Sequence, residues 1–317
     1  MPKRRGARIA LFQTELFPPE MNRATANILL LITGAIWGGG FVAQSTAMHA
    51  IGPVLFTGVR FLAAAAALLP FAAWEARAAG RNLAPAPGDW KRFALLGALL
   101  FASLSAQQIG LMTTTVTNSG FLTGLYVVLT PVVGIVLWRL WPHPVVWPAA
   151  LMSLGGIYLL SGGRFVGLQA GDWWTILCAA LWAFHVQFLG RFVTGARPLQ
   201  LAFSQFLVCG LLGLAVAPLV ETVAWDMVIA ARTEILFAGV ISGGIAFTIQ
   251  AIAQRHTTAP QAAIFMSSEA LFAALFGAVF LGDRIGPYGL AGCALIFCAI
   301  LAVEIVPMLR GEKRAAP

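Results

Sequence analysis

Two residues of opposite charge, Arg60 and Glu269, lie inside long apolar stretches of this 317-residue chain. A charge at membrane depth costs about 2.5–3.5 kcal/mol on insertion scales, so it needs a partner or an aqueous cavity. At about 1.5 Å per residue, Arg60 lies about 10 Å from one membrane face and Glu269 about 13 Å from the other, so the two can meet. Glu269 is therefore a candidate for binding a substrate amine or a coupling proton, with Arg60 acting on its ionisation. A structural ion pair is the competing interpretation.

An aromatic and imidazole set lies at similar depth. Trp37 and Trp182 are about 15–18 Å from a membrane face by helix rise, whereas tryptophan usually gathers at the interface. They can form a wall for a planar or amphipathic substrate, or they can simply pack helices. His185 lies three residues after Trp182, on the same helical face. A proton relay is one interpretation of His185, and a hydrogen bond between helices, which is common in membranes, is the favoured one.

Amide side chains also recur inside the apolar stretches, and hydrocarbon would leave their donors and acceptors unsatisfied. The seven are Gln44, Gln107, Gln108, Asn118, Gln187, Gln205 and Gln250. Each is expected to face a cavity or another helix. The four cysteines also lie in apolar stretches and show no metal-ligand spacing, so we expect neither a metal nor a cofactor.

The elements that must position these residues are transmembrane helices. Apolar residues make up 59% of the chain and charged residues only 10%, against about 25% charged in soluble domains, and the mean hydropathy is +0.85. This composition excludes a soluble globular protein. Ten apolar runs are each long enough to cross or nearly cross a membrane at roughly 20 residues per helix.

Basic residues alternate between the connections of these ten spans. Only Arg164, Arg232 and Arg284 fall on one side and Arg60 lies within a span, which leaves 16 of the 20 Lys and Arg on the other side with both chain ends. The positive-inside bias predicts that both termini are cytosolic. It also explains the net charge of +8 without a nucleic-acid partner.

The two halves of the sequence resemble each other. Trp37 and Trp182, and likewise Pro53 and Pro198, differ by 145 in residue number, and a threonine-rich segment at 113 recurs at 256. Five spans is an odd number, so a duplicate must enter the membrane from the opposite side. We predict an all-α membrane protein of ten transmembrane helices in two inverted five-helix repeats, with a site between them near mid-membrane. The expected divisions are a cytosolic extension at 1–24, in which either Met1 or Met21 is the start, repeats at 25–163 and 172–306, and a cytosolic tail at 307–317.

Five short stretches carry a family resemblance. They are Gly34–Phe41 (GAIWGGGF), Arg60-Phe61-Leu62, Leu129-Thr130-Pro131-Val132, Ser268-Glu269-Ala270 and Phe280-Leu281-Gly282-Asp283. Together they resemble the drug/metabolite transporter superfamily, in its ten-helix EamA-type branch, over roughly residues 25–306. Asp283 stands where family members commonly carry Glu. The resemblance implies transport of small organic molecules, often export, through a central cavity lined by helices from both halves.

The candidate substrate-binding residues come from the charge, depth and type of the side chains discussed above and from the resemblance, which selects amides on the lining helices together with Tyr126 and Ser267. They are Trp37, Gln44, Gln107, Gln108, Asn118, Tyr126, Trp182, His185, Gln250, Ser267 and Glu269, with Arg60 as a structural or coupling charge. A lining of neutral amides with one acid and few cations suits a zwitterionic or weakly polar metabolite better than a phosphate ester. Gln205 occupies the repeat position of Arg60 and is assigned to structure.

The expected function is secondary transport, by export or exchange, of small organic metabolites such as amino acids across the bacterial inner membrane by alternating access. No Walker A motif supports ATP drive, and no H-E-x-x-H or G-x-S-x-G motif supports an enzyme. A channel and an intramembrane enzyme are the alternatives. The expected partners are a small-molecule substrate, the lipid bilayer and a proton as candidate coupling ion. Substrate identity, direction and oligomeric state stay open.

Overall fold

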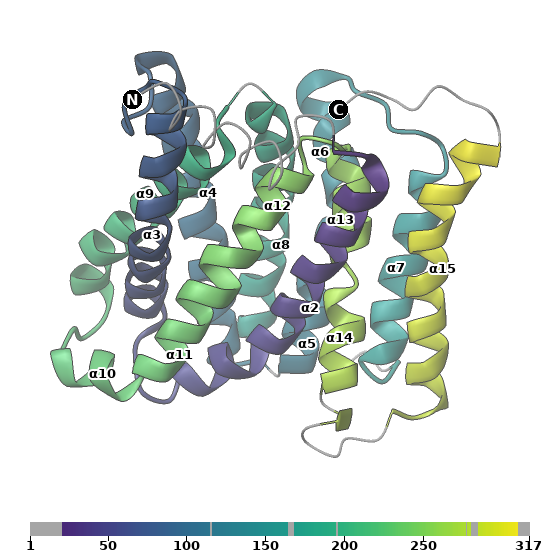
Figure 1. Cartoon of the computed structure of the whole chain (residues 1–317). Coiled ribbons are helices and arrows are strands. Elements are labelled where there is room, and N and C mark those ends of the chain that lie inside the picture. Colours follow the sequence, from purple (N-terminus) through teal and green to yellow (C-terminus); the bar gives the residue numbers. More distant parts are fainter. Residues whose placement is uncertain are drawn as a thin grey trace.

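The computed structural model describes residues 21–114, 116–163, 168–194, 196–276, 278–279 and 285–309. Within these ranges the chain is helical between short connections (Figure 1). The first half contains α2 (Arg23–Ala47), α3 (Pro53–Ala78), α4 (Pro87–Leu111), α5 (Val116–Thr123), α6 (Tyr126–Trp138) and α7 (Val146–Leu160). The second half contains α8 (Ala170–Val193), α9 (Pro198–Val220), α10 (Trp225–Ala230), α11 (Arg232–Leu236), the π-helix η1 (Phe237–Ala246), α12 (Phe247–Ala253), α13 (Ala259–Met266), α14 (Glu269–Phe276) and α15 (Pro287–Leu309).

These helices account for the predicted crossings. In the described part of the chain, nine helices or continuous helical runs are long and apolar enough to cross a membrane, and α7 adds a shorter apolar helix of 15 residues. The fourth crossing consists of α5 and α6, the eighth of α11, η1 and α12, and the ninth of α13 and α14. The predicted all-α fold of ten membrane helices is confirmed, and its two described ends, at α2 and α15, lie at the same edge of the bundle (Figure 1).

Helix starts follow from local sequence. Proline occupies the first turn of α3, α4, α9 and α13, where its missing N–H costs nothing and its fixed backbone angle suits a helix. The side chain of Asn22 caps α2 by accepting from the Thr25 backbone N–H at 2.8 Å. Residues that cap or open helices therefore set the boundaries of the crossings.

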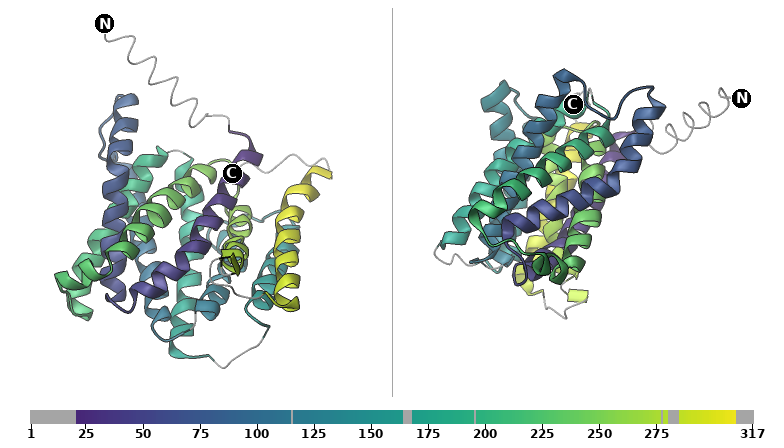
Figure 2. Two further views of the ribbon diagram at one scale, coloured as in Figure 1. Left: turned by 60° about the horizontal axis from the view of Figure 1, so that its bottom comes forward. Right: turned by 90° about the vertical axis from the view of Figure 1, so that its left-hand side faces the viewer.

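The two halves are interleaved in the bundle. α3 packs along α9, α4 along α8, and α7 along α15, so that each of these pairs joins one repeat to the other. The pair of α7 and α15 forms one side of the bundle, at the right of Figure 1 and of the left-hand view of Figure 2. A large buried apolar cluster lies between the halves and includes residues from both.

The α3–α9 pair is joined reciprocally at its two ends. The Glu221 carboxylate, just after α9, accepts from the backbone N–H groups of Val54 and Leu55 at the start of α3, at 3.2 and 2.5 Å. At the other end, Glu75 of α3 accepts from Leu199 and Gln200 at the start of α9, at 3.3 and 2.9 Å. The capped positions differ by 145 in number, which is the repeat offset. A carboxylate at a helix N-terminus satisfies orphan donors and complements the helix dipole.

Backbone contact at the centre of the same pair comes from glycine. A Cβ built on Gly58 would lie 2.9 Å from the backbone of Gly213, closer than side chains are found. The absence of a side chain at both positions therefore lets α3 and α9 touch along their backbones.

The fourth and ninth crossings are interrupted at equivalent places. After α5, the Leu125 N–H bonds to the Leu122 carbonyl, and after α13 the Ser268 N–H bonds to the Phe265 carbonyl. Both are tight three-residue turns, and they are 143 residues apart, as the repeat predicts. The first helical residues after the two interruptions are Tyr126 and Glu269. Pro131 lies inside α6, six residues after the first interruption, and neither interruption contains a proline.

Candidate functional site

A partly open cavity lies between the two halves of the bundle, with about 500 Å³ of empty space when the adjoining open solvent is included. α2, α3, α4, α5, α8, η1, α12 and α14 all contribute to its wall. Six of the predicted residues line it, namely Trp37, Gln44, Arg60, Gln107, Trp182 and Glu269. Gln44 lies toward the end of α2, Arg60 toward the start of α3 and Gln107 toward the end of α4, whereas Trp37 and Trp182 lie near the middle of α2 and α8. The cavity therefore occupies the half of the bundle farther from the two described chain ends.

Arg60 presents an unsatisfied edge in this wall. Its Nη1 donates to the Gln44 Oε1 at 2.8 Å, and its guanidinium lies over the rings of Phe56 and Phe61, 5.0 and 5.2 Å from their centroids. The Nε and Nη2 atoms are buried and have no hydrogen-bond partner. These two donors lie on one edge of the planar group, in the fork geometry that matches a carboxylate.

Amides hold the arginine in place. Gln44 Oε1 also accepts from Gln108 Nε2 at 2.7 Å, so Gln108 acts behind the wall rather than in it. Gln107 reaches the cavity and donates to Thr123 Oγ1 at 3.2 Å. The Gln44 amide oxygen, itself held by Gln108, orients the guanidinium without neutralising its charge.

Glu269 faces the same cavity from the N-terminus of α14. Its side chain is only 9% exposed, and within the described residues its carboxylate has no ion pair or hydrogen-bond partner. The partial positive charge of a helix N-terminus favours an anion there. Gly34 and Gly38 of α2 allow this approach, since a Cβ on Gly38 would lie 2.6 Å from the Glu269 carbonyl oxygen.

Arg60 and Glu269 share the cavity without forming an ion pair with each other. The structural ion pair considered from sequence is therefore absent. Helix rise fixes how deep a residue lies, but not the direction in which its side chain points.

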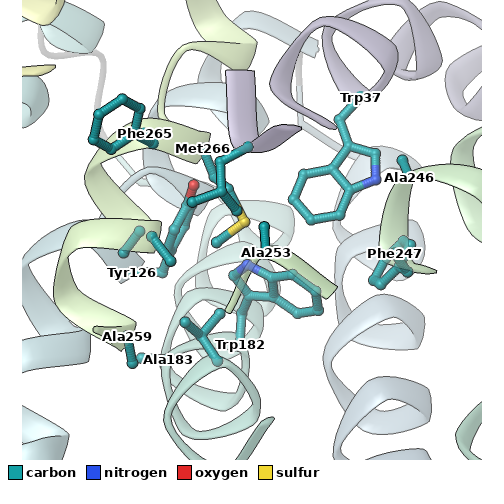
Figure 3. Close-up of a cluster of buried hydrophobic side chains, with 14 of the residues drawn as sticks. Trp37, Tyr126, Trp182, Ala183, Ala246, Phe247, Ala253, Ala259, Phe265 and Met266 are labelled. Carbon is teal, nitrogen blue, oxygen red and sulfur yellow. The ribbon is translucent and has the colours of Figure 1, made fainter. Parts of the chain in front are cut away.

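An aromatic layer lines the cavity on the side nearer the chain ends. Trp37 and Trp182, which are repeat counterparts, meet edge to face at 5.6 Å, and Phe247 contacts both at 4.8 and 5.5 Å (Figure 3). Trp37 Nε1 donates to the Ser242 carbonyl at 3.1 Å, which fixes its ring. Both tryptophans thus line the cavity and also pack helices together, so they combine the two roles that the sequence analysis offered as alternatives.

Other predicted residues lie outside the cavity wall. His185 is fully buried, stacks on Trp182 at 4.8 Å and pairs with Gln205 Oε1 at 3.0 Å, as expected for a hydrogen bond between helices. Gln250 donates to Gln254 Oε1 at 3.0 Å. Ser267 donates to the Ile264 carbonyl at 2.6 Å within the ninth crossing.

Two further predicted residues complete the set. Tyr126 is fully buried, and its hydroxyl has no hydrogen-bond partner. The side chain of Asn118 lies outside the described residues, as do Asp283 and its neighbours.

The cavity wall also contains residues that sequence reasoning missed. Leu104 and Phe247 both line it and differ by 143 in number, so the repeat offset could have found this pair. Thr123 and Ser242 gave no signal, since a single hydroxyl residue in an apolar helix commonly bonds to its own backbone. No cluster of three or more His, Cys, Asp or Glu side chains suited to a metal occurs among the described residues.

The family model of the EamA-like transporter family matches residues 24–162 and 169–305, one match for each half of the chain. The protein belongs to the EamA-like transporter family. This EamA-like protein is a multi-pass membrane transporter, and its two matched segments agree with the two five-helix repeats.

Two individual proteins are similar to this EamA-like chain. An "Uncharacterized transporter" from Archaeoglobus fulgidus is 27% identical over 286 residues, covering 90% of this chain and 87% of that protein. A protein of known crystal structure, 19% identical, superposes with a TM-score of 0.76 over 92% of this chain and all of its own. At this identity the structural likeness concerns the fold alone.

Proposed function

We propose that this protein is a secondary transporter that exports or exchanges small organic metabolites carrying both a carboxylate and an amine, such as amino acids. The observation that carries the proposal is that Arg60 and Glu269 are both buried in one cavity and are not paired with each other. A buried charge is costly unless it is compensated. A zwitterion supplies a carboxylate to the free edge of Arg60 and an ammonium to Glu269.

The rest of the wall agrees with a small organic solute. Trp37, Trp182, Phe41 and Phe61 give apolar surface for a side chain, and Gln107 gives an amide. Binding sites for small molecules are commonly apolar with a few placed polar groups. A phosphate ester would call for more cations than this wall provides.

The arrangement of repeats supports alternating access. We infer that the partly open cavity opens away from the chain ends and that the layer around Trp37, Trp182 and Phe247 closes it toward them. Inverted repeats carry a midplane site whose access changes when one unit moves against the other. With the basic connections in the cytosol of a bacterial inner membrane, this conformation opens toward the periplasm.

Counterflow in proteoliposomes tests the proposal. Vesicles loaded with a high concentration of an unlabelled amino acid should transiently accumulate the same labelled compound from outside, and the uptake should saturate and discriminate between enantiomers. An amine or a carboxylic acid alone should compete weakly. Flux that grows linearly with concentration would instead indicate a channel, and conversion of the substrate would indicate an enzyme.

A further inference from the structure

The cavity wall has a set of repeat counterparts in the closed half of the bundle. At the repeat offsets, Arg60 corresponds to Gln205, Gln107 to Gln250, and Glu269 to Tyr126. The offsets also hold in the structure itself, because they relate the reciprocal caps of α3 and α9 and the interruptions of the fourth and ninth crossings. These three polar wall residues thus each have an equivalent that does not line the observed cavity.

The closed half keeps polar atoms without partners. Gln205 Nε2, Gln250 Oε1, the Tyr126 hydroxyl and His185 Nδ1 are all buried and unsatisfied, and the four side chains are 0% exposed. A buried polar group without a hydrogen bond costs about 1–3 kcal/mol. Three of the four belong to the counterparts identified from the open cavity, and the fourth, His185, is hydrogen bonded to Gln205. Water entering this region would satisfy all of them.

We propose that the half of the bundle nearest the chain ends opens into a second cavity, lined by Tyr126, His185, Gln205 and Gln250, when the observed cavity closes. The inference rests on the alternating access proposed above and assigns the residues of the state that this structure does not display. The polar lining of the second cavity is uncharged at Tyr126, Gln205 and Gln250, whereas the observed one contains Arg60 and Glu269. The two openings therefore present different chemistry to the same solute.

The two cavities exclude each other for a geometric reason. Trp37 and Trp182 are counterparts that contact each other, and both lie in the wall of the observed cavity. Exchanging the conformations of the two repeats exchanges their roles, so the layer that now seals the chain-end side would seal the opposite side. A thermodynamic gain from hydrating the four unsatisfied atoms offsets part of the loss of packing in this layer.

Thiol labelling tests the proposal. In a variant whose Cys178, Cys209, Cys293 and Cys298 are replaced by alanine, single cysteines are introduced and the protein is reconstituted in nanodiscs, where both membrane faces are accessible. Gln250→Cys should react with a water-soluble methanethiosulfonate at least tenfold faster than Ala251→Cys, its fully buried neighbour. Gln107→Cys should also react because it lines the observed cavity. A second pair, Gln205→Cys against the buried Ala202→Cys, guards against a folding defect at one site.

Mutual exclusion gives the second measurement. In the double variant with cysteines at 107 and 250, a bulky maleimide attached first at 107 should hold the observed cavity open and slow labelling at 250 at least fivefold. Equal labelling of position 250 and its control, or of both cavities at once, would overturn the proposal. The transport hypothesis is judged separately: saturable counterflow with an unreactive Gln250→Cys refutes the second cavity alone, and a reactive Gln250→Cys without any counterflow refutes transport alone.

Discussion

Replacing Arg60 by glutamine should weaken substrate binding strongly while leaving the fold intact. Glutamine already occupies the repeat position of Arg60, at Gln205, so it fits a helix in this environment. The variant removes a forked pair of donors, Nε and Nη2, neither of which has a partner in the protein. Hydrogen bonds to charged groups contribute about 1.5–3 kcal/mol each, so we expect the loss of at least 3 kcal/mol of carboxylate binding. At 1.4 kcal/mol per factor of ten, the KM for counterflow should rise by roughly 100-fold.

The thermal stability of the Arg60→Gln variant should be equal to or higher than that of the parent protein. Arg60 is 3% exposed and makes one hydrogen bond, to Gln44, with no ion pair among the described residues. Removing its charge therefore also removes a desolvation cost of about 2.5–3.5 kcal/mol on insertion scales. The thermal midpoint of the purified variant should equal or exceed that of the parent. A large rise in KM together with unchanged or higher stability is what a binding role predicts and a structural role does not.

The control is Arg92→Gln, which removes a cation from an exposed pair with Asp89. Exposed pairs contribute about 0–1 kcal/mol, so both KM and the thermal midpoint should stay near the parent values. The reasoning is refuted if Arg60→Gln changes KM less than threefold, or if it lowers the midpoint by more than a few degrees, since Arg60 would then support the fold rather than the solute.

Three further predictions concern the acids and the helix contacts. The Glu269→Gln variant should fold normally, but its counterflow should not depend on pH between 5 and 9. If its initial rates keep the pH profile of the parent protein, Glu269 has no role in proton coupling. Glu75→Ala and Glu221→Ala should each lower the free energy of unfolding by about 0.5–2 kcal/mol, and the double variant by about the sum, because each removes the cap at a different end of the α3–α9 pair. The exposed Asp226→Ala serves as the control in thermal unfolding. If this control lowers the midpoint as much as either cap variant, the capping role of the two glutamates is contradicted. Gly38→Val should abolish transport and lower the thermal midpoint, because its side chain would collide with the backbone of α14, and a functional variant measured by counterflow would show that α2 can move away.

Sequence could predict the scaffold of this protein better than its site. The length of an apolar run indicates a membrane crossing directly, because the hydrocarbon core does not tolerate backbone N–H and C=O groups without hydrogen bonds. A constant offset in residue number between similar segments indicates a duplication. The interruptions at Gly124-Leu125 and Ser267-Ser268 share no residue type, so no local pattern could have found either. Their equivalence is visible only in the hydrogen bonds of the folded chain.

For the site, helix rise predicts how deep each side chain lies in the membrane but not the direction in which it points. Arg60 and Glu269 were placed near mid-membrane, and both do line one cavity, yet their side chains approach it from different parts of the wall without pairing. Gln108 and Gln107 are adjacent in sequence and therefore point about 100° apart around the helix, so one supports Gln44 and the other reaches the cavity. Helix rotation is set by packing against other helices, which a single sequence does not display.

The contacts within the bundle indicate where rearrangement can occur. Sliding α3 along α9 would break four hydrogen bonds to two carboxylates and separate backbones that touch at Gly58 and Gly213, so this pair should move as one body. The interruptions after α5 and α13 already lack regular helical bonds, so bending there costs less than bending an intact helix. Tyr126 and Glu269 stand immediately after these two points. A change of helix angle at either interruption would therefore displace Tyr126 or Glu269 first, and these are the residues by which the two proposed cavities differ.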